Sequence, residues 1–380
     1  MSAPIVIIGS GFAAYQLVKA LRKLDADHPI TVVTADDGHE YSKPDLSHVV
    51  SRGQRADDLV KLSGAQFAEQ HNITLLPRQT VERIDPAQRQ LVLADRRLSY
   101  DQLVLATGSR AMVPAIDGLT NGDIVTLNSL GEYQQHQQRL LDAESVLVIG
   151  AGLIGTELAM DLANAGKEVV LTDMAPRLLP RLLPEFIASR LHSCLSTQPV
   201  TLELATQVQT ADPQGRGYRV TLTNGHQHDV DAVVAAIGLR PNIQLARQAG
   251  LKVNQGIVVD SQLRTSERDI FALGDCAERN SQLEPYLQPA LLGANALAKT
   301  LLGSPTDVIR TNTLVKVKTP HLPIQLAGDT SHVGAQWEVK VDDEGMTASA
   351  FDSQQKLIGI VTTEQHMKNA FSLLRQLPLV

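Results

Sequence analysis

The sequence predicts an α/β fold made of two Rossmann-like domains and a small C-terminal α+β domain. One observation is a glycine turn, Gly9–Ala14, that follows an apolar run and has a close counterpart in Gly150–Gly155. A second is the change after about Thr313, where apolar and polar residues alternate as in half-exposed antiparallel strands. The 380 residues exceed one ordinary core, so two or three domains are expected.

The elements around the first turn follow the order strand, helix, strand. Ile5–Ile8 is a continuous β-branched run, which suits a parallel strand buried on both faces. Apolar residues then recur at three- and four-residue spacings over Tyr15–Leu24, as on one face of a helix. A second apolar run, Ile30–Val33, completes a βαβ unit.

The second turn lies in the same order of elements. Val146–Ile149 is the predicted strand, Leu158–Ala165 the helix with Gly166 as its C-cap, and Val169–Leu171 the next strand. The first glycines of the two turns are 150 − 9 = 141 residues apart. That period is too long for a solenoid and fits two copies of a nucleotide-binding domain.

Three later strands mark the domain boundaries. Leu98–Arg110 and Asp229–Asn242 each read as a strand that leaves one domain and crosses to the next, and Asp269–Glu278 reads as a strand that ends in Gly274–Asp275. We therefore predict a discontinuous first domain over 1–108 and 239–312, a second domain over 109–238, and a C-terminal domain over 313–380.

Composition excludes several classes of protein. A net charge of −7 and an aromatic content of 3% argue against a nucleic-acid-binding protein. No run approaches the roughly 18 apolar residues of a membrane span, and the N-terminus has no basic region or cleavage site. The only cysteines, Cys194 and Cys276, form no CxxC pair, which predicts reduced thiols in a cytoplasmic protein. No metal is expected, and the histidines without ligand spacing are predicted to lie at the surface: His39, His136 and His366.

Each turn has the residues that a bound dinucleotide requires. The first glycine allows a tight turn, the second lets the backbone approach a pyrophosphate, and a small third residue lets helix and strand pack closely. The phosphates then lie at the positive end of the helix. In chain order, these positions are Gly9, Gly11 and Ala14 in the first turn, and Gly150, Gly152 and Gly155 in the second.

An acidic residue after the second strand can accept hydrogen bonds from the ribose hydroxyls. In the second unit this residue is Asp173, which favours NADH over NADPH, although the nearby Arg177 could accommodate a 2′-phosphate. In the first unit Thr34 and Ala35 occupy the usual position, and Asp36 is the best candidate. Two nucleotide sites in one chain suggest hydride transfer between a nicotinamide and FAD.

The order of motifs resembles that of the flavin-dependent pyridine nucleotide reductases of the glutathione-reductase-like superfamily. The motifs are Gly9-x-Gly-x-x-Ala, Ala106-Thr-Gly, Gly150-x-Gly-x-x-Gly and Leu273-Gly-Asp. Disulfide reductases of this superfamily carry cysteine after the second strand, but Glu40–His48 contains no sulfur, so a thiolate mechanism is excluded.

This sulfur-free segment instead resembles the Tyr-x-[Arg/Lys]-Pro-x-Leu-Ser motif of ferredoxin, putidaredoxin and rubredoxin reductases. The resemblance implies that Lys43 contacts the cofactor near the flavin. A lysine usually occupies the position of His48, so His48 is a departure from the family. Ser10–Lys23, Tyr41–Leu59 and Leu314–Pro323 look most like the flavorubredoxin reductases.

That resemblance implies tightly bound, non-covalent FAD, NADH as co-substrate, and hydride transfer from nicotinamide C4 to flavin N5. Single electrons would then pass to a rubredoxin, or to the rubredoxin domain of a nitric-oxide-reducing flavodiiron protein. Two alternatives stay open. One is a ferredoxin-type reductase that serves an oxygenase, and the other is a redox-sensing flavoprotein of the apoptosis-inducing-factor type.

The resemblance also implies site residues. Lys43, Glu157 and Lys318 are the expected catalytic residues. The alternative for Glu157 is an acid in the first turn of a helix, where the helix dipole favours it. The alternative for Lys318 and Lys316 is a position on the solvated face of a strand. Asp275 is expected to hold the FAD ribityl chain, or to cap a helix. Helix Leu291–Leu302, opened by Gln288, Pro289 and Ala290, is expected to stabilise negative charge on reduced flavin. The expected cofactor-binding residues are Gly9, Gly11, Ala13, Ala14, Asp36, Lys43, Val81, Thr107, Gly108, Arg110, Gly150, Gly152, Ile154, Gly155, Glu157, Asp173, Gly238, Gly274, Asp275, Gln288, Pro289 and Lys318.

Overall fold

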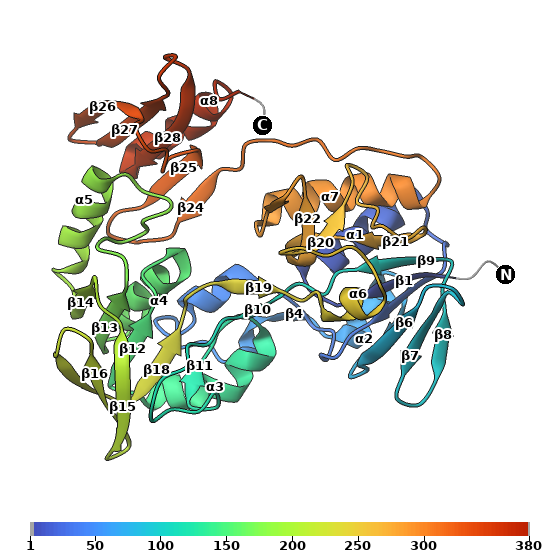
Figure 1. Ribbon diagram of the computed structural model, residues 1–380, viewed down its shortest axis with the longest axis horizontal. Helices are drawn as coiled ribbons and strands as arrows, with labels where there is room; N and C mark the ends of the chain where they lie inside the picture. The colour runs from blue at the N-terminus through green and yellow to red at the C-terminus, as the bar shows by residue number, and fades with distance from the viewer. Residues whose placement is uncertain (1–3, 379–380) are drawn as a thin grey trace. The chain divides into compact units, whose positions relative to one another are not determined.

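The computed structural model describes residues 4–378, so the ends of the predicted first and third domains, 1–3 and 379–380, lie outside the described residues. The chain divides into two compact units, each built from three stretches (Figure 1). Unit 1 contains residues 1–43, 59–110 and 239–310, and unit 2 contains residues 44–58, 111–238 and 311–380.

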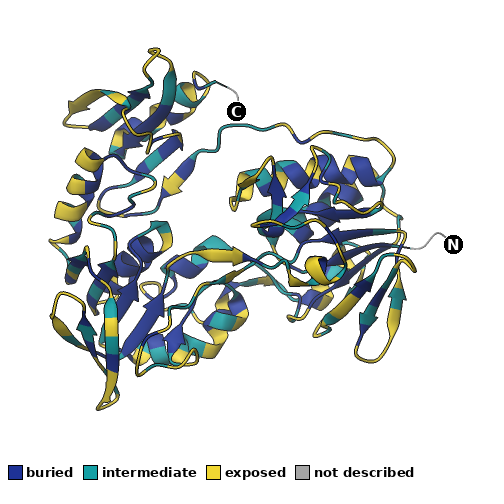
Figure 2. Cartoon of the chain, viewed as in Figure 1, coloured by how far each residue is buried: buried dark blue, intermediate teal, exposed yellow. Residues whose placement is uncertain are grey.

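Unit 1 is built on a five-stranded parallel sheet. Its strands, in spatial order, are β21 (Ile270–Ala272), β9 (Gln102–Leu105), β1 (Ile5–Ile8), β2 (Ile30–Val33) and β5 (Thr74–Leu76). Its helices are α1 (Phe12–Leu24), α2 (Gly64–Gln70), α6 (Gln244–Gln248) and α7 (Leu287–Leu301). Helices α1 and α7 pack side by side (Figure 1). The four residues of β1 are all buried, as the continuous β-branched run predicts (Figure 2).

Smaller sheets complete unit 1. One is antiparallel, with β6 (Val81–Asp85), β7 (Gln90–Leu93) and β8 (Arg97–Ser99). Another joins β20 (Ile257–Val259), β22 (Ala277–Arg279) and β23 (Gln282–Leu283), and a two-stranded ribbon joins β3 (Glu40–Tyr41) and β4 (Val60–Leu62). The predicted crossing segments pair as β10 (Ser109–Ala111) and β19 (Leu239–Pro241), where the chain passes between the units.

Unit 2 repeats the parallel sheet. Its strands, in spatial order, are β11 (Ile124–Val125), β18 (Ala232–Ala235), β12 (Ser145–Ile149), β13 (Glu168–Asp173) and β14 (Val200–Leu204). Its helices are α3 (Leu130–Asp142), α4 (Leu153–Asn164) and α5 (Glu185–Leu195). An antiparallel sheet of β15 (Val208–Gln214), β16 (Gly217–Leu222) and β17 (Gln227–Val230) follows in the chain.

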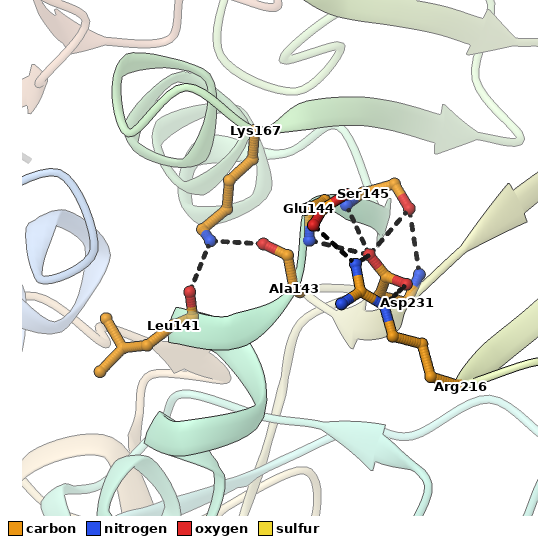
Figure 3. A network of polar contacts seen from close by, with 7 residues as sticks. All are labelled: Leu141, Ala143, Glu144, Ser145, Lys167, Arg216 and Asp231. Atoms are coloured by element: carbon orange, nitrogen blue, oxygen red, sulfur yellow. Dashed lines mark hydrogen bonds and ion pairs between the residues drawn. The ribbon is translucent and has the colours of Figure 1, made fainter.

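The entry to β12 is fixed by a polar network (Figure 3). The carboxylate of Asp231 accepts hydrogen bonds from the backbone N–H groups of Glu144 (2.8 Å) and Ser145 (3.0 Å) and from Arg216 (2.7 Å). Burial raises the pKa of Asp231, but these hydrogen bonds outweigh it and lower the pKa to about 2. Lys167 donates to the carbonyls that end α3, those of Leu141 and Ala143, where a cation suits the helix dipole.

The C-terminal part of unit 2 is an antiparallel sheet followed by a short helix, α8 (Ala370–Leu374). In spatial order the strands are β24 (Val315–Val317), β25 (Ile324–Gly328), β28 (Leu357–Thr363), β27 (Gly345–Phe351) and β26 (Gln336–Asp342). The alternating pattern after Thr313 therefore corresponds to the predicted antiparallel strands. The predicted surface position of His366 is wrong, because this side chain is buried and hydrogen-bonds Asp342 (2.9 Å) and Thr347 (3.0 Å).

The fold class is confirmed, with two differences in the elements. The run Leu98–Arg110 is broken into three short strands, and Gly108, with a positive φ of 62°, lies in the loop between β9 and β10. Helix α7 begins at Leu287, so Gln288 and Pro289 lie in its first turn rather than before it. The division into FAD-binding, NAD-binding and C-terminal domains stays a prediction. Within residues 4–378, no helix is both long enough and apolar enough to cross a bilayer.

Candidate functional site

The first glycine turn brings β1 and α1 close to the end of β9. Gly9 has a φ of 113°, and a Cβ added there would collide with the carbonyl oxygen of Ala106. A Cβ on Gly11 would meet no atom within 4 Å. Gly11 also caps α1 without a side-chain hydrogen bond, which leaves the first amides of the helix available to an anion. The turn therefore fits a pyrophosphate.

Hydroxyl groups connect this turn to the end of β2. Ser10 Oγ and Thr34 Oγ1 are 2.8 Å apart and both residues are buried. Thr34 Oγ1 also accepts the backbone N–H of Asp36 at 3.2 Å. Asp36 is exposed just beyond the strand, which is where a ribose ligand is expected.

The Ala106-Thr-Gly loop is held by the crossing segment. Asn242 Nδ2 donates to the carbonyl of Thr107, and Thr107 Oγ1 donates to the carbonyl of Asn242, each at 2.9 Å. Just past the loop, Ser109 Oγ donates to Asp275 Oδ2 at 2.8 Å, and Lys43 Nζ lies 3.8 Å from the same oxygen. Unit 1 thus brings Lys43, Thr107 and Asp275, which the sequence places far apart, into one neighbourhood.

Other predicted flavin-side residues lie beside this group. A Cβ on Gly274 would lie 2.7 Å from the Cβ of Ala13, so the Leu273-Gly-Asp motif lies against the first turn. Gly274 and Pro289 line the same pocket of unit 1. Asp275 lies in a short 3₁₀ segment, Gly274–Cys276, and makes no cap to it. The expected role of Asp275 as a helix cap is therefore wrong.

The second turn is tightly packed at its third position, where the first turn has alanine. Gly150 has a φ of 106°, and its Cβ would lie 2.6 Å from the carbonyl oxygen of Ala236. A Cβ on Gly155 would collide with the carbonyl oxygen of Gly150, so only glycine fits there. Gly152 is open and caps α4 without a side-chain hydrogen bond, as Gly11 does for α1.

Asp173 ends β13 as predicted, and its carboxylate is already oriented. Its Oδ2 accepts the backbone N–H of Ala151 at 2.6 Å, and its Oδ1 accepts that of Ala175 at 2.7 Å. Each carboxylate oxygen can accept a further hydrogen bond, so ribose hydroxyls can still bind. The guanidinium of Arg177 donates to the carbonyl of Pro180 at 3.2 Å.

Glu157 is buried and joins three parts of unit 2. Its Oε2 accepts Ser47 Oγ at 2.9 Å and lies 3.8 Å from His48 Nε2, while its Oε1 accepts the backbone N–H of Lys318 at 2.8 Å. Helix α4 has no acid in its first turn, so the alternative role of Glu157 as a first-turn acid is wrong. Lys318 lies just beyond β24, half-buried, and donates to the carbonyl of Pro44 at 3.0 Å, whereas Lys316 is exposed on the strand.

His48 lies at the position where the family resemblance predicts a lysine, but it does not supply the positive charge of a lysine. Burial is the main cause that lowers the pKa of His48, and the nearby cations Lys318 and Arg52 lower it further, against the opposing effect of Glu157. The imidazole is therefore neutral at neutral pH.

Sequence reasoning missed Ser47 and Asp161 as polar partners in this region. A usable signal was the four-residue spacing of Glu157 and Asp161, which places both acids on one face of a helix.

The remaining expected residues are less clearly connected to a site. Val81 begins β6, a strand of the small antiparallel sheet of unit 1. Arg110 is exposed in β10, Ile154 is exposed in the first turn of α4, and Gly238 has a φ of 114° between β18 and β19. Their contact with a cofactor stays a prediction. Among the described residues, no cluster of three or more acidic, histidine or cysteine side chains could hold a metal ion, and both cysteines are free thiols.

Comparison with known proteins places the chain in a family. The model of the family described as "Pyridine nucleotide-disulphide oxidoreductase" matches residues 3–291, and a "Rubredoxin binding C-terminal domain" matches residues 310–377. The chain is 50% identical to a nitric oxide reductase FlRd-NAD(+) reductase of Aliivibrio fischeri, over 99% of each chain. It is 48% identical to the protein of the same name in Escherichia coli, over 100% of each chain.

Solved structures agree with these matches. A ferredoxin reductase for the CYP199A2 system from Rhodopseudomonas palustris superposes with a TM-score of 0.90 at 27% identity, covering 100% of this chain and 96% of that one. The putidaredoxin reductase–putidaredoxin complex gives a TM-score of 0.87 at 25% identity, with coverage of 97% and 92%. The chain belongs to the pyridine nucleotide-disulphide oxidoreductase family and carries a rubredoxin-binding C-terminal domain.

Proposed function

We propose that the chain passes hydride from NADH to FAD and then single electrons to a rubredoxin centre, such as the rubredoxin domain of a nitric-oxide-reducing flavorubredoxin. The observation that carries the proposal is the pair of glycine turns, each open at its second glycine, in a chain that ends in a rubredoxin-binding domain. The full-length relatives named FlRd-NAD(+) reductase support the same acceptor.

The residues have distinct tasks in this reaction. Bound FAD supplies the chemistry that accepts a hydride and gives up electrons one at a time. Gly9 and Gly11 leave room for its pyrophosphate, and Asp275, oriented by Ser109, holds its ribityl chain. Gly150, Gly152 and Asp173 bind NADH and orient it; holding the reactants in position is worth roughly 7–11 kcal/mol of the barrier.

Glu157 and Lys318 are the proposed catalytic residues of unit 2, and Lys43 that of unit 1. A buried carboxylate that accepts a hydroxyl and a backbone N–H is oriented rather than mobile, so Glu157 offers a fixed negative group. Hydride transfer needs no protein acid or base. It also needs no thiol, and residues 40–58 contain no cysteine.

We propose the cytoplasm as the compartment, since both thiols are free. A ferredoxin-type reductase is the second candidate, favoured by the likeness to the Rhodopseudomonas palustris structure.

Stopped-flow absorbance tests the proposed function. The purified flavoprotein is mixed with NADH, and the reduced protein is then mixed with a rubredoxin or with a [2Fe–2S] ferredoxin. Fast bleaching by NADH and fast reoxidation by rubredoxin are expected. Faster reoxidation by the ferredoxin would favour the second candidate, and a failure of both acceptors to reoxidise the flavin would refute electron transfer to iron proteins.

A further inference from the structure

One stretch of chain leaves unit 1 and packs on unit 2. We call residues 44–58 the arm. The arm lies between β3 and β4, which pair with each other in unit 1, yet the arm itself belongs to unit 2. It directly follows Lys43, the proposed flavin-side cation. What holds the arm therefore fixes the chain that directly follows this cation.

The middle of the arm is held by Asp161 of α4. Asp161 Oδ2 accepts the backbone N–H of Val50 at 2.9 Å, and both carboxylate oxygens lie 3.4 Å from the backbone N of Ser51. Ser51 Oγ donates to the same carboxylate. The side chain of Asp161 is only 2% exposed. A buried carboxylate is stable only with such partners, so Asp161 and the arm require each other.

The far half of the arm is held by α3. Tyr133, which is fully buried, donates its hydroxyl to the carbonyl of Gln54 at 2.6 Å. Gln137 Oε1 accepts the backbone N–H of Ala56 at 3.0 Å. These contacts use backbone groups of the arm, so they fix its path rather than a single side chain.

The helix that holds the arm also begins at the nucleotide turn. Asp161 lies four residues after Glu157 on α4, and the two acids share one face of the helix. From Leu153 to Asp161 the helix rises about 12 Å. One rigid element therefore carries the N-terminus expected to bind the nucleotide pyrophosphate, the Glu157 contact with Lys318, and the Asp161 contact with the arm.

The equivalent helix of unit 1 lacks these acids. Counting from the second glycine of each turn, Gln16 of α1 corresponds to Glu157 and Ala20 corresponds to Asp161. The nucleotide-binding fold therefore does not itself require acids there.

We propose that Asp161 is a positioning residue for hydride transfer. It fixes the arm to the helix that starts at the NADH turn, so that the segment directly after Lys43 keeps one geometry on unit 2. The proposal rests on the hydride transfer proposed above, with Asp161 acting through the arm and touching neither cofactor.

The test compares Asp161→Ala and Asp161→Asn with Glu168→Gln, which removes an exposed acid from the same domain. Hydrogen–deuterium exchange of residues 49–56 in the FAD-bound protein measures arm fixation. In Asp161→Ala, exchange there is expected to rise roughly tenfold or more, since the amides lose their acceptor. Single-turnover reduction by NADH is expected to slow by up to about 100-fold at saturation, with FAD content unchanged and little change in NADH affinity. Glu168→Gln should match the parent protein in every readout.

The kinetic isotope effect with NADH deuterated at the transferred position separates positioning from simple destabilisation. If misplaced reactants slow the hydride step, the isotope effect on the limiting rate is fully expressed in Asp161→Ala. Faster arm exchange with an unchanged limiting rate would overturn the proposal, as would unchanged arm exchange. If Asp161→Ala does not fold, Tyr133→Phe loosens the arm at its other end and must give the same pattern at smaller amplitude. A parent protein that NADH does not reduce would instead refute the proposed function.

Discussion

The two glycine turns have the same backbone and different reinforcement. In both, the first glycine has a φ above 100° and the second has open space beside it. In the first turn, the hydroxyls of Ser10 and Thr34 link the loop to the next strand. In the second turn, the carboxylate of Asp173 links the loop to the strand instead, by accepting the backbone N–H of Ala151.

This difference teaches how one fold can serve a resident cofactor and a transient substrate. A neutral hydroxyl pair ties the first turn together, and the residues proposed to recognise the cofactor, Asp36 and Asp275, lie beyond it. In the second turn, one carboxylate both ties the loop and faces the expected ribose position, so loop geometry and nucleotide choice depend on the same group. Hydrogen bonds to a charged group are the stronger kind, and an acid at this position favours a free ribose over a 2′-phosphate.

The largest expected effect is a loss of NADH-dependent flavin reduction when the third glycine of the second turn is replaced by alanine, the residue that the first turn has there. Gly155→Ala places a Cβ against the carbonyl oxygen of Gly150 and forces α4 away from the turn. A misplacement of about 1 Å can cost roughly 100-fold, and NADH-dependent flavin reduction should fall by at least that factor. The reciprocal change, Ala14→Gly, should leave NADH reduction near the parental rate. Equal losses in both variants, measured by stopped flow with FAD content as control, would contradict the difference between the turns.

The next effect concerns nucleotide choice. Asp173→Arg removes the ribose acceptor and supplies a cation for a 2′-phosphate, so preference should move from NADH towards NADPH. Losing hydrogen bonds to a charged group costs about 1.5–3 kcal/mol, or roughly 10- to 150-fold in kcat/KM for NADH. The measurement is kcat/KM for both nucleotides. A ratio equal to that of the parent protein would show that Asp173 does not contact the ribose.

A smaller effect concerns His48, which lies beside Glu157 of α4. Burial lowers the pKa of His48, so below about pH 6.5 the unfolded chain takes up a proton before the folded chain does. The free energy of unfolding should therefore decrease as pH falls below 6.5, by at most about 1.4 kcal/mol per pH unit from this group. Urea unfolding at pH 7.5 and 5.5 should show a smaller decrease in His48→Gln than in the parent. Parallel changes in both proteins would assign the pH dependence to other groups.

The smallest effect is expected at sulfur. The combined change Cys194→Ser and Cys276→Ser should leave turnover close to that of the parent, since the proposed mechanism uses neither thiol. Cys276 is fully buried, and burial raises the pKa of its thiol, so a cost of about 1 kcal/mol in stability is expected. A folded, FAD-containing double variant without turnover would overturn the thiol-free mechanism.

Local patterns in the sequence predicted the parts of the fold that local patterns determine. The buried strands at Ile5 and Val146, the turns after them and the acid at Asp173 all follow from runs, glycine spacing and strand length. The contact of Glu157 with Lys318 and the contact of Asp161 with the arm join residues more than 100 positions apart, and the spacing of the two acids does not reveal these partners. The prediction for His366 failed because its partners, Asp342 and Thr347, come from strands 24 and 19 residues earlier in the chain, beyond the reach of a local pattern.

The interrupted path of the chain also sets an order of assembly. Unit 1 needs β21 beside β9 and α7 beside α1, so its sheet cannot be complete before residue 272 is made, and α7 cannot cover α1 before residue 301 is made. The parallel sheet of unit 2 is complete within residues 124–235, and such a local unit gains its contacts earlier during synthesis. The parallel sheet of unit 2 can therefore form before that of unit 1, although unit 2 itself is completed only by its last stretch, from residue 311.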